Sequence, residues 1–467
     1  LTGCVEKPGE ATLSIQELKC EGLENPVGLD IPAPRLSWVL TSDRRNTMQT
    51  AYRVMVATSA DLLETDSADL WDTEKIPGDS MKVVYRGKKL QSQEEAYWKV
   101  KVWSGDAASS WSAVQRWSVG LRYHNEWQGR WIGFDRAFPW DREEMFSRLS
   151  ARYFRKEFQT TQGKEIRDAM VYIMGLGLYE LHLNGKRVGT QVLSPAPTDY
   201  QKNVKYNSFA IGDLLEPGDN ALGVVLGNGR YHTMRQHYKP YKIKNFGYPK
   251  LLLNLVIRYA DGSTEVISTN DSWKGTADGP IRSNNEYDGE IYDARKEFVD
   301  WTVPGFNDSN WLPAEYVQEP GGAYEAQVNE NMAVMDTLSP MTIKALRPGV
   351  YIMDMGQNMT GWLKIRVQGA RGTTVMLRFA ESLQADGSLF TENLRDALAT
   401  DQYILRGGGV EEWQPAFVYH GFRYVELTGY TGTPDPEDFK GMVVYDGIPA
   451  TGSFHSSDTL LNRIYAA

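Results

Sequence analysis

Four carboxylates gather in one short stretch of this chain, NNEYDGEIYDAR, at Glu286, Asp288, Glu290 and Asp293. On a strand, Glu286, Asp288 and Glu290 would share one face, and Asp293 would lie on the other. Like-charged neighbours raise one another's pKa or attract a cation. Three interpretations stay open: a solvated acidic loop, an oxygen-ligand site that suits Ca²⁺, and a catalytic carboxyl pair. The pair is the least favoured, because the stretch holds no His or Lys to tune it.

A second set of polar residues recurs between predicted strands of residues 351–430, where a plain sandwich does not require them. Arg423, within HGFRY, could form a bidentate ion pair with a carboxylate such as Glu381. We favour a bracing role for these residues, within the sandwich or at its contact with a neighbouring domain, over contact with a substrate. The predicted inter-domain residues are Glu381, Arg395, His420 and Arg423.

Period-2 alternation predicts the strands that position these residues. It appears in residues 35–40, 52–56 and 97–103, and again in 151–158 and 251–259. In residues 362–367, apolar residues alternate with basic ones, which would place them on opposite faces of a strand. Residues 178–189 predict a hairpin with an Asn-Gly turn. The fold class is therefore all-β, with consecutive β-sandwich domains at 11–122, 127–325 and 326–448 after a linker at 1–10.

Composition limits the class of protein. The 467 residues suggest about three domains, and a net charge of −10 makes nucleic acid an unlikely partner. The sequence contains no run of 18 apolar residues, which is the length that a membrane-spanning helix needs. The two cysteines, Cys4 and Cys20, do not suggest a zinc site.

Several sequence blocks resemble one known family. DMGQNMTGW, AESL-x-x-DGSL, NLR-x-A-x-ATD-x-Y and HGFRYVE are similar to the β-sandwich that precedes the catalytic barrel in bacterial α-L-rhamnosidases, glycoside hydrolase family 78. LNGKRVG, PAPTDY, LGNGRY and YDGE-x-YDAR resemble the jelly-roll domain of the same family. Residues 11–122 look like a fibronectin type III-like sandwich.

The resemblance implies an enzyme that hydrolyses terminal α-L-rhamnosides with inversion, which needs two carboxyl groups about 6.5–9.5 Å apart. In the family both lie in an (α/α)6 barrel. Residues 449–467 resemble the start of its first helix, with Ser457 or Asp458 as the N-cap. We therefore expect the acid and base beyond residue 467, no catalytic residue in this chain, and no catalytic cofactor. The competing hypothesis is a non-catalytic cell-surface carbohydrate-binding protein.

The resemblance also implies ligands for the jelly roll, since some family members carry a calcium-dependent rhamnose-binding module there. The candidates for L-rhamnose-containing glycans are Asp199, Tyr200, Asn228, Tyr231 and Tyr287. Those for Ca²⁺ are Asn284, Asp288 and Glu290.

The first four residues, Leu1-Thr2-Gly3-Cys4, resemble the lipobox that ends a bacterial lipoprotein signal peptide. The resemblance implies acylation of Cys4 and an exported protein, periplasmic or anchored to the outer membrane.

Overall fold

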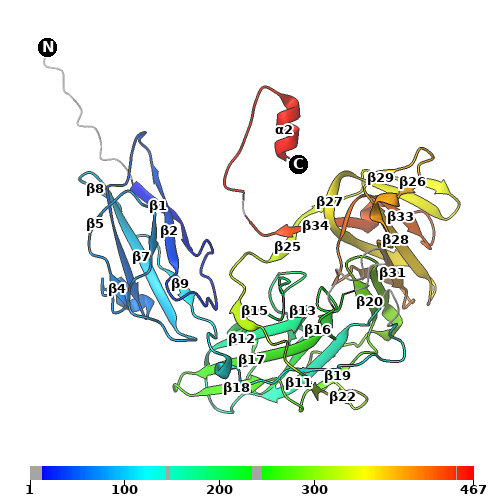
Figure 1. Ribbon diagram of the computed structural model, residues 1–467, viewed down its shortest axis with the longest axis horizontal. Helices are drawn as coiled ribbons and strands as arrows, with labels where there is room; N and C mark the ends of the chain where they lie inside the picture. Colours follow the sequence, from blue (N-terminus) through cyan, green and yellow to red (C-terminus); the bar gives the residue numbers. More distant parts are fainter. Residues whose placement is uncertain (1–12, 143–147, 234–244, 449, 467) are drawn as a thin grey trace.

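The computed structural model describes residues 13–142, 148–233, 245–448 and 450–466. It confirms the predicted fold class, because these residues are almost all in β-sheets or in the turns between them. Figure 1 shows three β units, with the middle unit between the first and the third and the short helix α2 (Thr459–Ala466) set apart from the sheets. Asp458 Oδ1 accepts hydrogen bonds from the N–H groups of Leu460 and Leu461, so Asp458 is the N-cap. Among the described residues, no helix has the length and apolar character to cross a bilayer.

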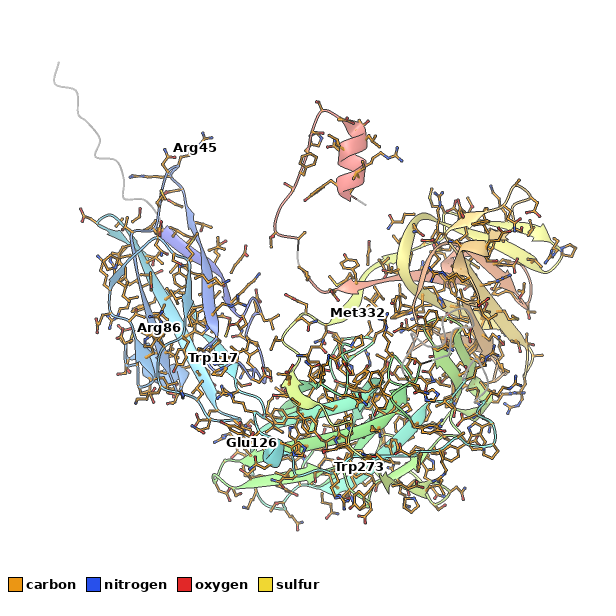
Figure 2. All side chains as sticks on the ribbon, in the orientation of Figure 1. Arg45, Arg86, Trp117, Glu126, Trp273 and Met332 are labelled. Atoms are coloured by element: carbon orange, nitrogen blue, oxygen red, sulfur yellow. The ribbon has the colours of Figure 1, made fainter. Side chains whose placement is uncertain are left out.

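The first unit is a sandwich of two sheets around buried tryptophans, and it contains the strands predicted at 35–40, 52–56 and 97–103. Trp98 and Trp117 are at most 1% exposed, and Figure 2 shows Trp117 inside this unit. One sheet holds β1 (Leu13–Cys20), β2 (Arg35–Ser42) and β6 (Lys82–Val84). The other holds β4 (Trp71–Asp72), β3 (Ala51–Ala57), β7 (Glu95–Ser104) and β8 (Ala107–Ala108), with β5 (Ile76–Pro77) on β3 and β9 (Gln115–Ser118) on β7; helix α1 (Ala60–Glu64) follows β3.

The middle unit also has two sheets, and Trp273 is fully buried in it (Figure 2). One sheet runs β23 (Glu315–Tyr316), β10 (Ile132–Gly133), β17 (Lys250–Tyr259), β12 (Ile166–Leu176), β15 (Asn203–Ala210) and β24 (Ala323–Ala326), with β18 (Thr264–Ser268) on β17. The other runs β14 (Lys186–Arg187), β13 (Leu178–Leu183), β16 (Asp219–Gly227), β11 (Arg152–Gln159), β19 (Lys274–Thr276) and β22 (Leu312–Pro313). The predicted Asn-Gly turn joins β13 to β14, because Asn184 and Gly185 both have positive φ, 50° and 79°.

The third unit is built around the 19-residue strand β27 (Val350–Gln368). Leu363, Ile365 and Val367 are buried while Lys364 and Arg366 point away from the core, as the alternation predicts. The sheet order is β20 (Ile281–Asn285), β21 (Gly289–Asp293), β31 (Thr400–Ile404), β28 (Thr374–Ala380), β33 (His420–Thr428), β27, β34 (Phe439–Asp446) and β25 (Met332–Leu338), with β26 (Thr342–Arg347) and β32 (Val410–Trp413) on β27; β29 (Ser382–Leu383) pairs with β30 (Leu389–Phe390).

Hydrogen bonds connect the units. Tyr206 of the middle unit donates to the carbonyl of Leu121 at the end of the first unit, over 3.1 Å. The hairpin β20–β21 lies in the sequence of the predicted jelly roll, yet β21 pairs in parallel with β31, Ile291 opposite Gln402. The middle unit therefore contributes two strands to the sheet of the third. The domain boundaries given above stay predictions.

Candidate functional site

The acidic stretch singled out in the sequence forms a hairpin and not one strand, so residues 286, 288 and 290 do not share a strand face. Asn285 Oδ1 accepts hydrogen bonds from the N–H groups of Tyr287 and Asp288, at 2.9 and 2.7 Å, and closes the turn. Gly289 follows with φ +104°, and a Cβ on it would meet the carbonyl oxygen of Thr400 at 2.2 Å. This glycine lets the hairpin approach β31 closely.

Glu290, just after this turn, is fully buried where the middle and third units meet. Its carboxyl group accepts from the N–H groups of Ala416 and Phe417, each at 3.2 Å. Its own N–H donates to Asp401 Oδ1 over 2.9 Å. Burial raises the pKa of Glu290 well above its usual range, and the negative charge of Asp401 raises it further. Burial therefore favours the neutral, protonated form of Glu290 over the carboxylate.

Asp401 connects Glu290 to His420. His420 Nε2 lies 3.0 Å from Asp401 Oδ1, and the His420 ring stacks on Phe379 at 4.2 Å. Asp401 Oδ2 has no hydrogen-bond partner among the described residues. Asp401 and Glu290 are both 0% exposed, so no glycosidic bond reaches them. The arrangement is that of a joint between two units and not of a catalytic pair.

The side-chain oxygens of the three residues predicted to bind Ca²⁺ already accept hydrogen bonds from other groups of the chain. Asn284 Oδ1 accepts from the N–H of Asn228, and Asn228 Nδ2 donates to the carbonyl of Asn284, both at 2.8 Å. Asp288 Oδ2 lies 3.8 Å from Arg148 Nε, and Glu290 is bound as described. The described residues contain no group of three or more His, Cys, Asp or Glu side chains placed to hold a metal ion. The calcium site stays a prediction.

The structure corrects three of the five predicted carbohydrate contacts. Tyr200 and Tyr231 are 1% and 2% exposed and pack edge to face at 5.0 Å, because large aromatic side chains gain most when a core covers them. Asn228 is also buried, since it holds the β20–β21 hairpin. None of these three faces a sugar. Asp199 and Tyr287 are exposed, and their sugar contact stays a prediction.

The predicted bidentate pair of Arg423 exists, but the prediction of its partner was wrong. Arg423 Nε and a terminal nitrogen bind the two oxygens of Asp354 at 2.8 and 3.0 Å. The hydrogen bonds from Arg423 lower the pKa of Asp354. Asp354 lies opposite Tyr424 on the adjacent strands β27 and β33, and Arg423 is the next residue along β33, at a point where the register shifts. Only this strand pairing brings the two side chains together.

The other predicted inter-domain residues lie in different places. Glu381 is exposed and accepts from Asn358 Nδ2 and Asn393 Nδ2, at 3.0 and 3.2 Å. Arg395 is exposed in a loop with φ +59°, whereas His420 is buried beside Asp401. Cys4, the predicted lipidation site, lies outside the described residues.

Comparison with known families gives three consecutive matches. Residues 15–123 match "Rha78A-like, N-terminal immunoglobulin domain". Residues 164–336 match "Alpha-L-rhamnosidase N-terminal domain", and residues 344–445 match "Bacterial alpha-L-rhamnosidase concanavalin-like domain". Together the matches follow the order of the three β units.

Curated relatives agree with these matches. An α-L-rhamnosidase of Formosa agariphila is 33% identical over 98% of this chain and 50% of its own length. One from Streptomyces avermitilis is 29% identical over 98% of this chain and 60% of its own length. The chain thus spans about half to three-fifths of the length of these relatives.

Solved structures superpose closely. The α-L-rhamnosidase of Dictyoglumus thermophilum has a TM-score of 0.89 and 39% identity, covering 97% of this chain and 51% of that one. The Streptomyces avermitilis α-L-rhamnosidase complexed with L-rhamnose has a TM-score of 0.90 and 28% identity, covering 97% and 60%.

Proposed function

We propose that this chain, which belongs to the bacterial α-L-rhamnosidases of glycoside hydrolase family 78 as their N-terminal β portion, is the non-catalytic part of an enzyme that releases terminal α-linked L-rhamnose with inversion. The observation that carries the proposal is the run of three family matches over residues 15–445, in the order of the β units. The acid and base of this reaction lie in the part of the relatives' length that this chain does not span. The burial of Glu290 and Asp401 supports this, because a substrate and the attacking water must both reach an inverting pair.

In this proposal the third unit braces the catalytic domain. Polar groups of this unit outside its hydrophobic core support this role, because Arg423 pairs with Asp354 and the exposed Glu381 binds Asn358. Such groups suit a polar contact between domains, which is typically more polar than a hydrophobic core.

The test compares two proteins on 4-nitrophenyl α-L-rhamnoside. We expect no nitrophenol from residues 1–467 alone, and steady release from a longer protein that continues through the remaining length of the relatives. NMR of the first product should show β-L-rhamnose, the anomer that inversion produces. Turnover by residues 1–467 alone would overturn the placement of the acid and base. A longer protein that cleaves other glycosides but not this one would overturn the substrate.

A further inference from the structure

We propose that a groove between the middle and third units binds an uncharged saccharide. The groove encloses about 610 Å³, within the size range of small-molecule sites. One wall consists of β13, β14 and the segment 297–301, and the other of β32 and residues 414–416. None of the residues predicted from the sequence to contact a sugar lies in it.

The groove has an apolar floor and an aromatic wall. Val225 and Ile281 form the floor with Tyr153, whose ring meets that of Trp301 edge to face at 5.6 Å. Trp301 is only half-buried, so part of its ring faces the groove. It sits over Gly223, where a Cβ would come within 2.7 Å of the indole. Gly223 has no side chain and so leaves room for the Trp301 ring. The C–H face of a sugar can pack on the exposed part of this ring.

Ionic side chains line the groove, and each has a partner of opposite charge. On one wall Arg187 Nε lies 3.3 Å from Glu180 Oε1. On the other, Lys364 Nζ lies 3.0 Å from Glu412 Oε2. Glu297, at the edge, pairs with an arginine outside the groove at 2.6 Å.

Paired charges of this kind offer several donors and acceptors without a net field. A phosphate or a metal ion would find no uncompensated charge here, whereas neighbouring hydroxyl groups can bind both members of an ion pair. The combination of an aromatic wall, an apolar floor and compensated charges favours a neutral polyol over the other two ligand classes.

The identity of the sugar rests on the proposed function. A 6-deoxyhexose carries a methyl group in place of a hydroxymethyl group, and the floor of Val225 and Ile281 would cover such a methyl group without an unsatisfied hydroxyl. The groove is therefore assigned to L-rhamnose units of the glycan.

The experiment is a calorimetric titration of this chain with methyl α-L-rhamnoside, with inorganic phosphate titrated in parallel. We expect heat from the rhamnoside and none from phosphate. Trp301→Ala should weaken binding about tenfold or more, since a buried aromatic contact is worth on the order of 1.4 kcal/mol or above. Tyr123→Ala, which removes a ring that is 61% exposed and outside the groove, should bind as the unchanged chain does.

Trp301 also packs on Trp311, so a second variant guards against a loss of folding. Glu412→Gln changes a side chain that is 58% exposed and should weaken binding a few-fold with the fold intact. Absence of heat with the unchanged chain would overturn the proposal. So would an affinity in both groove variants that equals that of the unchanged chain. If the groove binds the rhamnoside but the longer protein hydrolyses no rhamnoside, only the proposed function is refuted. If the longer protein is active but the groove binds no rhamnoside, only the proposed binding site is refuted.

Discussion

Glu290 shows how a single buried carboxyl group makes the joint between two units sensitive to pH. Its side chain accepts two backbone N–H groups and meets no cation among the described residues, so protonation lowers the cost of burying it. Because the pKa is higher in the folded than in the unfolded chain, the folded state binds more protons between the two values. Stability is then full below the unfolded pKa and is lost as the pH rises through the folded one.

We predict that Glu290→Gln removes this loss, because the amide oxygen still accepts the two N–H groups and carries no charge. The midpoint of urea unfolding, followed from pH 4 to pH 8, should favour the variant increasingly as the pH rises, by up to about 1.4 kcal/mol per pH unit. Glu392→Gln, at an exposed position, serves as the control and should leave the pH profile unchanged. A constant difference between Glu290→Gln and the unchanged chain at all pH values would contradict a raised pKa for Glu290.

At the scale of elements, strand positions follow from the sequence more completely than strand partners do. Alternation finds β2, β7, β11 and β17, and the turn between β13 and β14 follows from Asn184-Gly185. Each of these signals is local. The pairing of β21 with β31 depends on residues far apart in the chain, and no local pattern encodes it.

The errors in the candidate site have the same cause. A tyrosine side chain can stack on a sugar or pack in a hydrophobic core. Only the surroundings of Tyr200 and Tyr231, which the structure shows to be buried, distinguish the two roles. Arg423 was predicted to pair with a carboxylate, but the choice of Asp354 depends on how β27 lies against β33. No sequence pattern marked Trp301 as a sugar contact, because the groove that it lines forms only where two units pack together.

Gly289 tests the hairpin that joins the units. We predict that Gly289→Ala destabilises the chain by about 2–4 kcal/mol, since it combines an unfavourable φ with a clash against the carbonyl oxygen of Thr400. Gly262→Ala is the matched control: its φ is +84° with nothing within 4 Å of the added Cβ, so the cost should be about 1 kcal/mol. Urea unfolding measures both. Equal costs for the two variants would show that the hairpin does not need close contact with β31.

At the scale of the whole molecule, we expect the middle and third units to unfold as one cooperative body. They share a sheet through β21 and β31, and Phe417 of the third unit packs against Gly227 of the middle one, where a Cβ would come within 2.3 Å of its ring. This differs from units joined only by a linker, which open independently.

Differential scanning calorimetry should therefore show the middle and third units unfolding in a single transition. The first unit can unfold at a different temperature, because within the described ranges its sheets share no strand with those of the other units. Two resolved transitions that map, by proteolysis of the heated protein, to the middle and to the third unit would disprove the shared body.

The pairing of β21 with β31 also sets an order of events during synthesis. The backbone N–H of Glu290 cannot form its hydrogen bond until Asp401, which is 111 residues later in the chain, has been synthesised. At about 5–20 residues per second, the ribosome needs on the order of ten seconds to supply that partner. Until then the hairpin edge is open to water, and the docking of the nascent third unit buries the Glu290 carboxyl group and raises its pKa.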